Sequence, residues 1–219
     1  MIGLFRLIEF RFYRSTSHKI HSFCPLYLDL SYPATCRRSK DSASLTYQPL
    51  TCETVNSINA SFYSIIPEDP ISRTNLLAIA VRVAFHDAAE VDLQQADDTL
   101  GPDGCLSNDP DNAGLIETTS LVMTQLDDLW QSYCDQISRA DFWVLTAKLA
   151  LAATSSNNLH VPFQYGRVDA SSCAGGTERL PAGQFHLQST ANFFKSQLDL
   201  ELSDAGINYS GYIHSYLCT

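Results

Sequence analysis

The sequence predicts an all-α fold with an extended irregular loop over one face. Apolar residues recur at helical spacing in most segments after about residue 48, and no segment shows the alternating pattern of a half-buried strand. Residues 92–114 interrupt this pattern because they are rich in Asp, Gly, Pro and Asn. Such a segment is too polar for the core and too long for a simple connection, so we expect a loop that carries function.

Five helices are expected in chain order. The first covers residues 52–66, where polar and apolar positions follow helical spacing and prolines mark its end. The second begins near Ser72 or Thr74, either of which can cap it, and runs through His86. Its core side carries Leu76, Leu77, Ile79, Ala80 and Val83.

Three further helices follow the loop. One is expected over residues 115–132, and the next, over residues 137–153, opens with Ser138-Arg-Ala-Asp141, the pattern of a capping box. An irregular segment broken by glycines precedes the last helix, over residues 186–200. The core side of the 115–132 helix is expected to carry Leu121, Leu126, Leu129 and Trp130.

Composition sets the broad class of the protein. A chain of 219 residues with 45% hydrophobic and 17% charged residues can bury one sizeable core and is predicted to be neither disordered nor membrane-spanning. The net charge of -10 argues against nucleic acid as a partner, because phosphate binding needs basic clusters. We therefore expect a folded protein with no transmembrane segment and no nucleic-acid partner.

Cysteine usage indicates a secreted protein. Seven cysteines are scattered singly, with no Cys-x-x-Cys pair of the kind that a zinc site needs. Two glycosylation sequons, at Asn59 and Asn208, agree with that compartment. No clear signal peptide is visible, because Arg6, Glu9 and Arg11 interrupt the apolar start of the chain. We expect a secreted or extracellular protein with disulfides.

The motif Arg82-Val-Ala-Phe85-His86-Asp87 carries the strongest chemical signal. Arg82 lies one helical turn before His86, so both side chains share one face and can reach a common ligand. Burying a charge and an imidazole side by side is costly unless something uses them. An amphipathic helix with two satisfied polar residues is the alternative interpretation of this motif alone.

Four further motifs follow this one: Gly101-Pro-Asp103-Gly104, Asp111-Asn112-Ala113-Gly114-Leu115, Ile137-Ser-Arg-Ala-Asp141 and Tyr165-Gly166-Arg167-Val-Asp169. In this order and spacing the series resembles the plant-type haem peroxidase superfamily over about residues 50–200. The Asn112 and Tyr165 motifs are similar to the ascorbate and cytochrome c peroxidase branch, while Phe85 and Asp87 are similar to the secreted branches.

The resemblance implies haem b as cofactor, with hydrogen peroxide and a small reducing substrate as partners. His86 is then the acid and base of peroxide cleavage, and Arg82 stabilises the charge that develops as the oxygen–oxygen bond breaks. Asn112 would accept the Nδ1 proton of His86 and so set the tautomer. Phe85 would line the pocket. A simple turn residue is the alternative for Asn112, and a core aromatic for Phe85.

The resemblance also implies a calcium site and a buried ion pair. Asp87, Gly101 and Asp103 would supply oxygen ligands to calcium, although Cys105 stands where the family has a serine hydroxyl. Asp141 and Arg167 would form the ion pair. A bridge between Cys105 and Cys173 is also implied, although the sequence does not assign the pairing of its cysteines.

The chain departs from the family near its end. His214 lies 128 residues after His86, a plausible separation for the iron ligand, but glycines interrupt its expected helix. We therefore expect a basic N-terminal segment (1–47), a peroxidase distal domain (48–204) and a divergent tail (205–219), as if the chain were truncated at the proximal haem-ligand helix. Two functions stay open: a haem peroxidase, or a haem-free or inactive helical binding module stabilised by calcium.

Overall fold

The computed structural model describes eight parts of the chain: residues 50–92, 94, 101–106, 110–115, 121–155, 162–170, 180 and 187–201. Within them the chain forms five α-helices, one short 3-10 helix and no strand, which confirms the predicted all-α class. The predicted segment 1–47 and the predicted tail 205–219, which includes His214, lie outside the described residues, as does Cys173.

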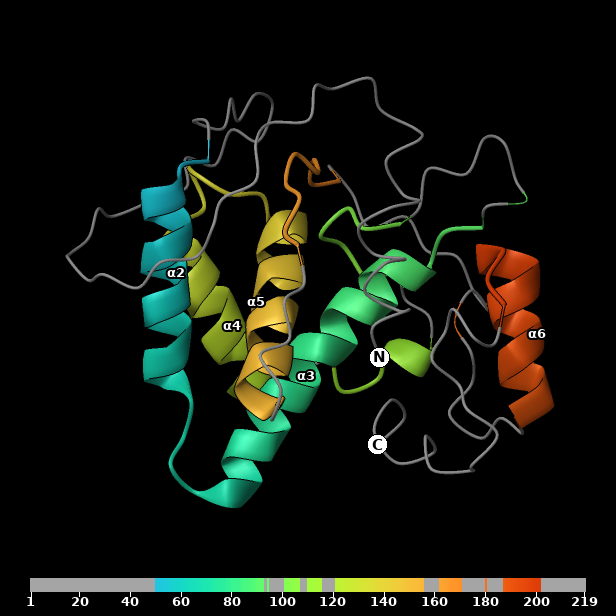
Figure 1. Cartoon of the computed structure of the whole chain (residues 1–219), viewed down its shortest axis with the longest axis horizontal. Helices are drawn as coiled ribbons and strands as arrows, with labels where there is room; N and C mark the ends of the chain where they lie inside the picture. Colours follow the sequence, from blue (N-terminus) through green and yellow to red (C-terminus); the bar gives the residue numbers. More distant parts are fainter. Residues whose placement is uncertain are drawn as a thin grey trace.

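The helices form a bundle with one outlying member (Figure 1). α3 packs chiefly against α5, while α6 lies beyond the C-terminal end of α3. None of the helices in the described residues is long and apolar enough to cross a bilayer. The elements are α2 (Cys52–Ile65), α3 (Pro70–Ala89), η2 (Pro110–Asn112), α4 (Leu121–Gln131), α5 (Arg139–Thr154) and α6 (Leu187–Leu198).

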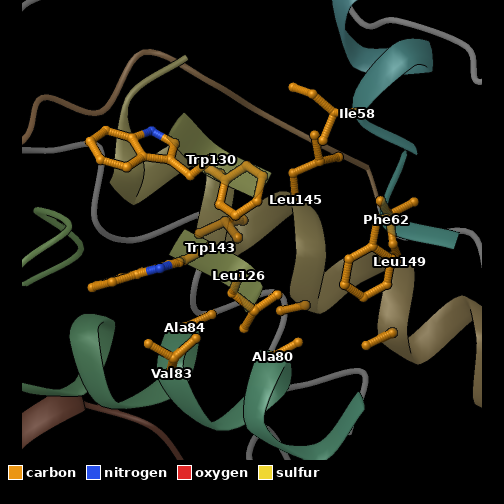
Figure 2. Close-up of a cluster of buried hydrophobic side chains, with 14 of the residues drawn as sticks. Ile58, Phe62, Ala80, Val83, Ala84, Leu126, Trp130, Trp143, Leu145 and Leu149 are labelled. Atoms are coloured by element: carbon orange, nitrogen blue, oxygen red, sulfur yellow. The ribbon is translucent and has the colours of Figure 1, made fainter. Parts of the chain in front are cut away.

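α5 is the central helix of the bundle. Every residue from Ala140 to Leu151 is buried, so α5 contacts neighbours on all sides. Figure 2 shows Trp143 and Leu145 of α5 in the cluster that α2, α3 and α4 complete. The buried hydroxyl of Thr146 makes a hydrogen bond within α5, because it donates to the carbonyl oxygen of Phe142 at 3.0 Å.

Two predicted helix starts are wrong. α3 begins at Pro70, because the Asp69 carboxylate caps the helix by accepting a hydrogen bond from the Ser72 backbone N–H at 3.0 Å. Proline suits this first turn, because it lacks the backbone N–H group that would have no partner there. α4 begins at Leu121, and Leu115 lies in a turn. Leu121, predicted to face the core, is 81% exposed, while Val122 and Met123, one turn before the buried Leu126, pack against the core.

The start of α5 is capped by two different side chains. The Ser138 hydroxyl accepts from the Asp141 backbone at 3.1 Å, as the predicted capping box requires. The reciprocal bond is not made, since the Asp141 carboxylate binds Arg167 instead. The carboxylate of Asp169 accepts from the backbone N–H groups of Arg139 at 2.9 Å and Ala140 at 3.0 Å. Asp169 therefore accepts from the two first-turn N–H groups of α5 that Ser138 does not bind.

The sequon at Asn59 lies inside the core of the fold. Asn59 sits in the middle of α2, is only 7% exposed, and has a buried side-chain carbonyl oxygen. A glycan on its amide nitrogen is incompatible with this packing. The sequon therefore gives no support for secretion, and the second sequon, at Asn208, lies outside the described residues.

Candidate functional site

Arg82, His86 and Asn112 form a hydrogen-bonded cluster, as the sequence predicts. The Nε of Arg82 donates to the Nε2 of His86 at 3.3 Å, and the Nδ1 of His86 lies 2.9 Å from the Oδ1 of Asn112. Because Nε2 accepts from a guanidinium, the single proton of a neutral imidazole sits on Nδ1 and is donated to Asn112. The contacts of this cluster therefore favour one tautomer of His86.

The segment around η2 holds both the amide and the guanidinium in place. The Nη2 of Arg82 donates to the carbonyl oxygens of Asp111 and Ala113, each at 3.0 Å. Asn112 is fully buried, and the turn that follows it closes with a bond of 3.0 Å from the Leu115 N–H to the Asn112 carbonyl. Gly114 makes this turn with φ +79°, a conformation that other residues rarely adopt.

Glu90 belongs to the same cluster and was missed by the sequence analysis. Its Oε1 accepts from the Nδ2 of Asn112 at 2.7 Å, and its side chain is 2% exposed. A carboxylate only accepts, so it selects the orientation of Asn112 in which Nδ2 faces Glu90 and Oδ1 faces His86. The available signal was spacing, because Glu90 follows His86 by four residues and so lies on the same side of α3.

Phe85 closes one side of the cluster and connects it to α6. Its ring lies edge-on to the His86 ring, with centroids 5.8 Å apart, and 6.2 Å from the ring of Phe194. Gln197 adds a polar contact, since its Nε2 donates to the Ala89 carbonyl oxygen at 2.8 Å. α6 is therefore attached to the turn of α3 that carries His86, around a second apolar cluster.

Comparison with known protein families shows which family this chain belongs to. The family model described as Peroxidase matches residues 55–205, which is more than half of the chain. The chain belongs to the peroxidase family. This agrees with the resemblance to the plant-type haem peroxidases, and the family's activity is oxidoreduction acting on peroxide. A comparison with curated proteins finds no match.

The predicted metal residues of this peroxidase family member lie next to the cluster. The Asp87 carboxylate is buried and accepts from three successive backbone N–H groups at 3.2 to 3.3 Å, those of Asp103, Gly104 and Cys105. The Asp103 carboxylate also accepts from Cys105 at 3.0 Å. The carbonyl oxygen of Gly101 accepts the Asp103 N–H at 2.7 Å. The 101–106 loop thus folds around Asp87.

Burial raises the pKa of two neighbouring carboxylates, those of Asp87 in α3 and Asp103 in the 101–106 loop. Burial and then the nearby charge of Asp103 raise the pKa of Asp87 well above its usual value. Burial also raises the pKa of Asp103, to about 6, with a smaller contribution from the charge of Glu90. The described part of the chain gathers no group of three or more His, Cys, Asp or Glu side chains that could hold a metal.

The predicted ion pair between Asp141 and Arg167 is confirmed. The Nη1 of Arg167 lies 2.8 Å from the Oδ1 of Asp141, with little exposure on either side chain. The backbone N–H groups of Gly166 and Arg167 donate to the same carboxylate at 2.7 and 3.3 Å. Burial raises the pKa of Asp141, and the nearby Arg167 opposes that shift. The pair fastens the 162–170 segment to the start of α5.

Proposed function

We propose that this peroxidase family member is a haem-dependent enzyme that reduces hydrogen peroxide and oxidises a small donor. The observation that carries the proposal is the pair of contacts on His86, whose Nδ1 faces Asn112 and whose Nε2 faces Arg82. An imidazole held in this way is prepared to take a proton at Nε2. The overall reaction takes two electrons from donor molecules and two protons, and converts one peroxide into two waters.

The donor set fits the peroxide-binding side of a haem site. His86 is a poor candidate for an iron ligand, because Asn112 engages one ring nitrogen and the guanidinium of Arg82, which repels cations, engages the other. When bound, haem b supplies a redox-active iron. The residues proposed to face it are Arg82, Phe85 and His86. The assignment of His214 as iron ligand stays a prediction, because this residue lies outside the described part of the chain.

His86 and Arg82 divide the proposed chemistry between them. Nε2 of His86 removes the proton from one oxygen of hydrogen peroxide and returns it to the other oxygen, which leaves as water. The guanidinium of Arg82 stays charged throughout, and it stabilises the negative charge that develops as the oxygen–oxygen bond lengthens. The carbonyl oxygens of Asp111 and Ala113 hold the guanidinium in position for this role.

Haem reconstitution of the full-length chain tests the proposal. We expect a Soret band whose change on adding peroxide slows by about 10² to 10⁴-fold in His86→Ala, the usual loss when a general base is removed. Arg82→Leu should slow the same step, and Arg73→Leu is the matched control, because Arg73 is an exposed residue of the same helix. A chain that takes up haem but reacts equally fast without His86 would refute the assigned roles.

A haem-free module stabilised by calcium is the second candidate function. The buried Asp87 carboxylate and the partly buried Asp103 favour it: burial raises the pKa of both, and the charge of Asp103 raises that of Asp87 further, so a divalent cation would stabilise their charged forms. This candidate predicts no Soret band after reconstitution and a calcium-dependent rise in the melting temperature. A rise together with haem uptake would assign the calcium to the peroxidase.

We further propose that the protein is secreted and carries disulfides. The support comes from the sequence, in which seven cysteines are scattered singly, a pattern typical of secreted proteins with disulfides. The predicted bridge between Cys105 and Cys173 stays a prediction, because Cys173 lies outside the described residues. Peptide mapping of the unreduced protein by mass spectrometry identifies the pairs, and the culture medium of a secreting host tests the compartment.

A further inference from the structure

The two tryptophans of the chain share one cation. Trp130 of α4 and Trp143 of α5 are both buried, with exposures of 1% and 6%. The guanidinium carbon of Arg139 lies over both rings, 5.3 Å from the centroid of Trp130 and 5.4 Å from that of Trp143. Both distances lie within the range of a cation–π contact. Every indole in the protein therefore faces the same positive charge.

Both the side chain and the backbone of Arg139 are held by hydrogen bonds. Its Nε donates to the Gly104 carbonyl oxygen at 2.6 Å, and its backbone N–H donates to the Asp169 carboxylate at 2.9 Å. As the first residue of α5, it also belongs to the rigid central helix. The guanidinium is thus a fixed charge over the two rings rather than a mobile surface group.

A fixed cation over an indole opposes loss of an electron from that ring. The cation is attracted to the electron-rich face, and this attraction turns into repulsion when the ring itself becomes positive. Oxidation also becomes easier when the indole proton can leave. The Nε1 of Trp130 donates to the Ile137 carbonyl oxygen at 3.2 Å, and an amide carbonyl is too weak a base to remove that proton.

We propose that Arg139 protects Trp130 and Trp143 from one-electron oxidation. The need for protection rests on the proposed function, because α5 packs against α3, the helix that carries His86 (Figure 2). The oxidising equivalents that peroxide delivers at that site would otherwise be reduced by one electron from an indole, which would become a radical cation. With Arg139 in place, these equivalents are kept for the external donor.

Oxidation of the haem-free, full-length chain by azide radical tests the protection without any peroxidase activity. We expect Arg139→Gln to form indolyl radicals about tenfold faster than the original chain, a factor that corresponds to about 1.4 kcal/mol. Arg139→Lys keeps the charge and should stay close to the original rate. Acrylamide quenching of tryptophan fluorescence reports whether either substitution exposes the rings. Arg139→Met replaces Arg139→Gln if the latter does not fold.

Each outcome decides for or against the protection. A faster rate in the uncharged variant alone, with unchanged quenching, supports it. Equal rates in all variants overturn it, and so does an equal increase in the glutamine and lysine variants, which would indicate exposure rather than charge. In a second arm, the haem-loaded chain is treated with peroxide and oxidised tryptophan is counted by mass spectrometry. Absence of any peroxide reaction there would refute the proposed function and leave the azide comparison intact.

Discussion

Glu90 accepts a hydrogen bond of 2.7 Å from the side-chain amide of Asn112. Asn112 connects Glu90 to the proposed base, because the Oδ1 of the same amide lies 2.9 Å from the Nδ1 of His86. An amide can turn over with little change of shape, and only its neighbours decide which atom faces which. Glu90 therefore supports, through Asn112, the same tautomer of His86 that the contact of Arg82 with Nε2 favours.

Glu90→Gln should weaken this control, because glutamine can donate as well as accept. The amide of Asn112 can then turn over and donate to Nδ1, which moves the imidazole proton to Nε2, breaks the contact from Arg82 and disables the base. We expect the peroxide reaction to slow by about 10- to 100-fold, the usual effect of losing such a supporting contact. Nitrogen-15 NMR of the haem-free chain should show the tautomer change.

The control for Glu90 is Glu68→Gln, an exposed glutamate outside the helices. It makes the same change of charge and should leave both readouts unaltered. An unchanged His86 tautomer in Glu90→Gln would show that the turn around Asn112, rather than Glu90, orients the amide.

The stability of the fold should fall as pH rises when a chelator is present. Folding raises the pKa of Asp103 from 3.8 to about 6, so its contribution is present in full below pH 3.8 and is lost as pH rises through about 6. Because this carboxyl is only partly buried, we expect about 1 kcal/mol, or about 2–4 °C in melting temperature. Thermal melts across this pH range measure it.

Two comparisons make the pH experiment specific. Asp103→Asn is neutral at every pH and should flatten the decline. Added calcium should restore stability near pH 7, because it favours the charged carboxylates. Equal pH profiles for the aspartate and asparagine forms would mean that Asp103 is not the titrating group.

Breaking the ion pair between Asp141 and Arg167 should destabilise the protein strongly. Arg167→Met leaves a buried carboxylate with backbone donors alone, and losses of about 3–5 kcal/mol are usual for such a change. Urea unfolding measures the loss. Replacing both partners by apolar residues should recover part of it, and a double variant as unstable as the single one would argue against a specific pair. Glu201→Gln, which removes an exposed partner of Lys195, is the surface control.

Gly104→Ala should be far more disruptive than Gly166→Ala. Both glycines have positive φ, +71° and +122°, so both substitutions strain the backbone. A Cβ on Gly104 would also lie 2.6 Å from the carboxylate of Asp169 and 2.8 Å from the backbone nitrogen of Ala140, whereas a Cβ on Gly166 meets nothing within 4 Å. Melting temperatures of the two variants measure the difference. Similar losses would show that φ alone dominates.

The sequence predicted the helices and their buried faces well, but the ends of the helices only in part. Apolar spacing predicted α2, α5 and α6 closely, because burial of one helix face repeats along the sequence. The start of α3 was misjudged, since Asp69 and Ser72 are both ordinary cap residues and only the folded backbone shows which side chain reaches an N–H. The side of Leu121 was also misjudged, because it lies five residues before the buried Leu126, whereas residues three or four apart share a helix face.

By itself, the sequence determined the all-α class and the shared helix face of Arg82 and His86, since these rest on helical spacing, while its resemblance to the peroxidases implied the contact of His86 with Asn112 and the pairing of Asp141 with Arg167. Only the tertiary structure brought Glu90 to Asn112, Asp169 to the start of α5, and Arg139 over both indoles. Such contacts join segments that are distant in the chain or that share no motif, and packing of the helices alone sets the distances between them.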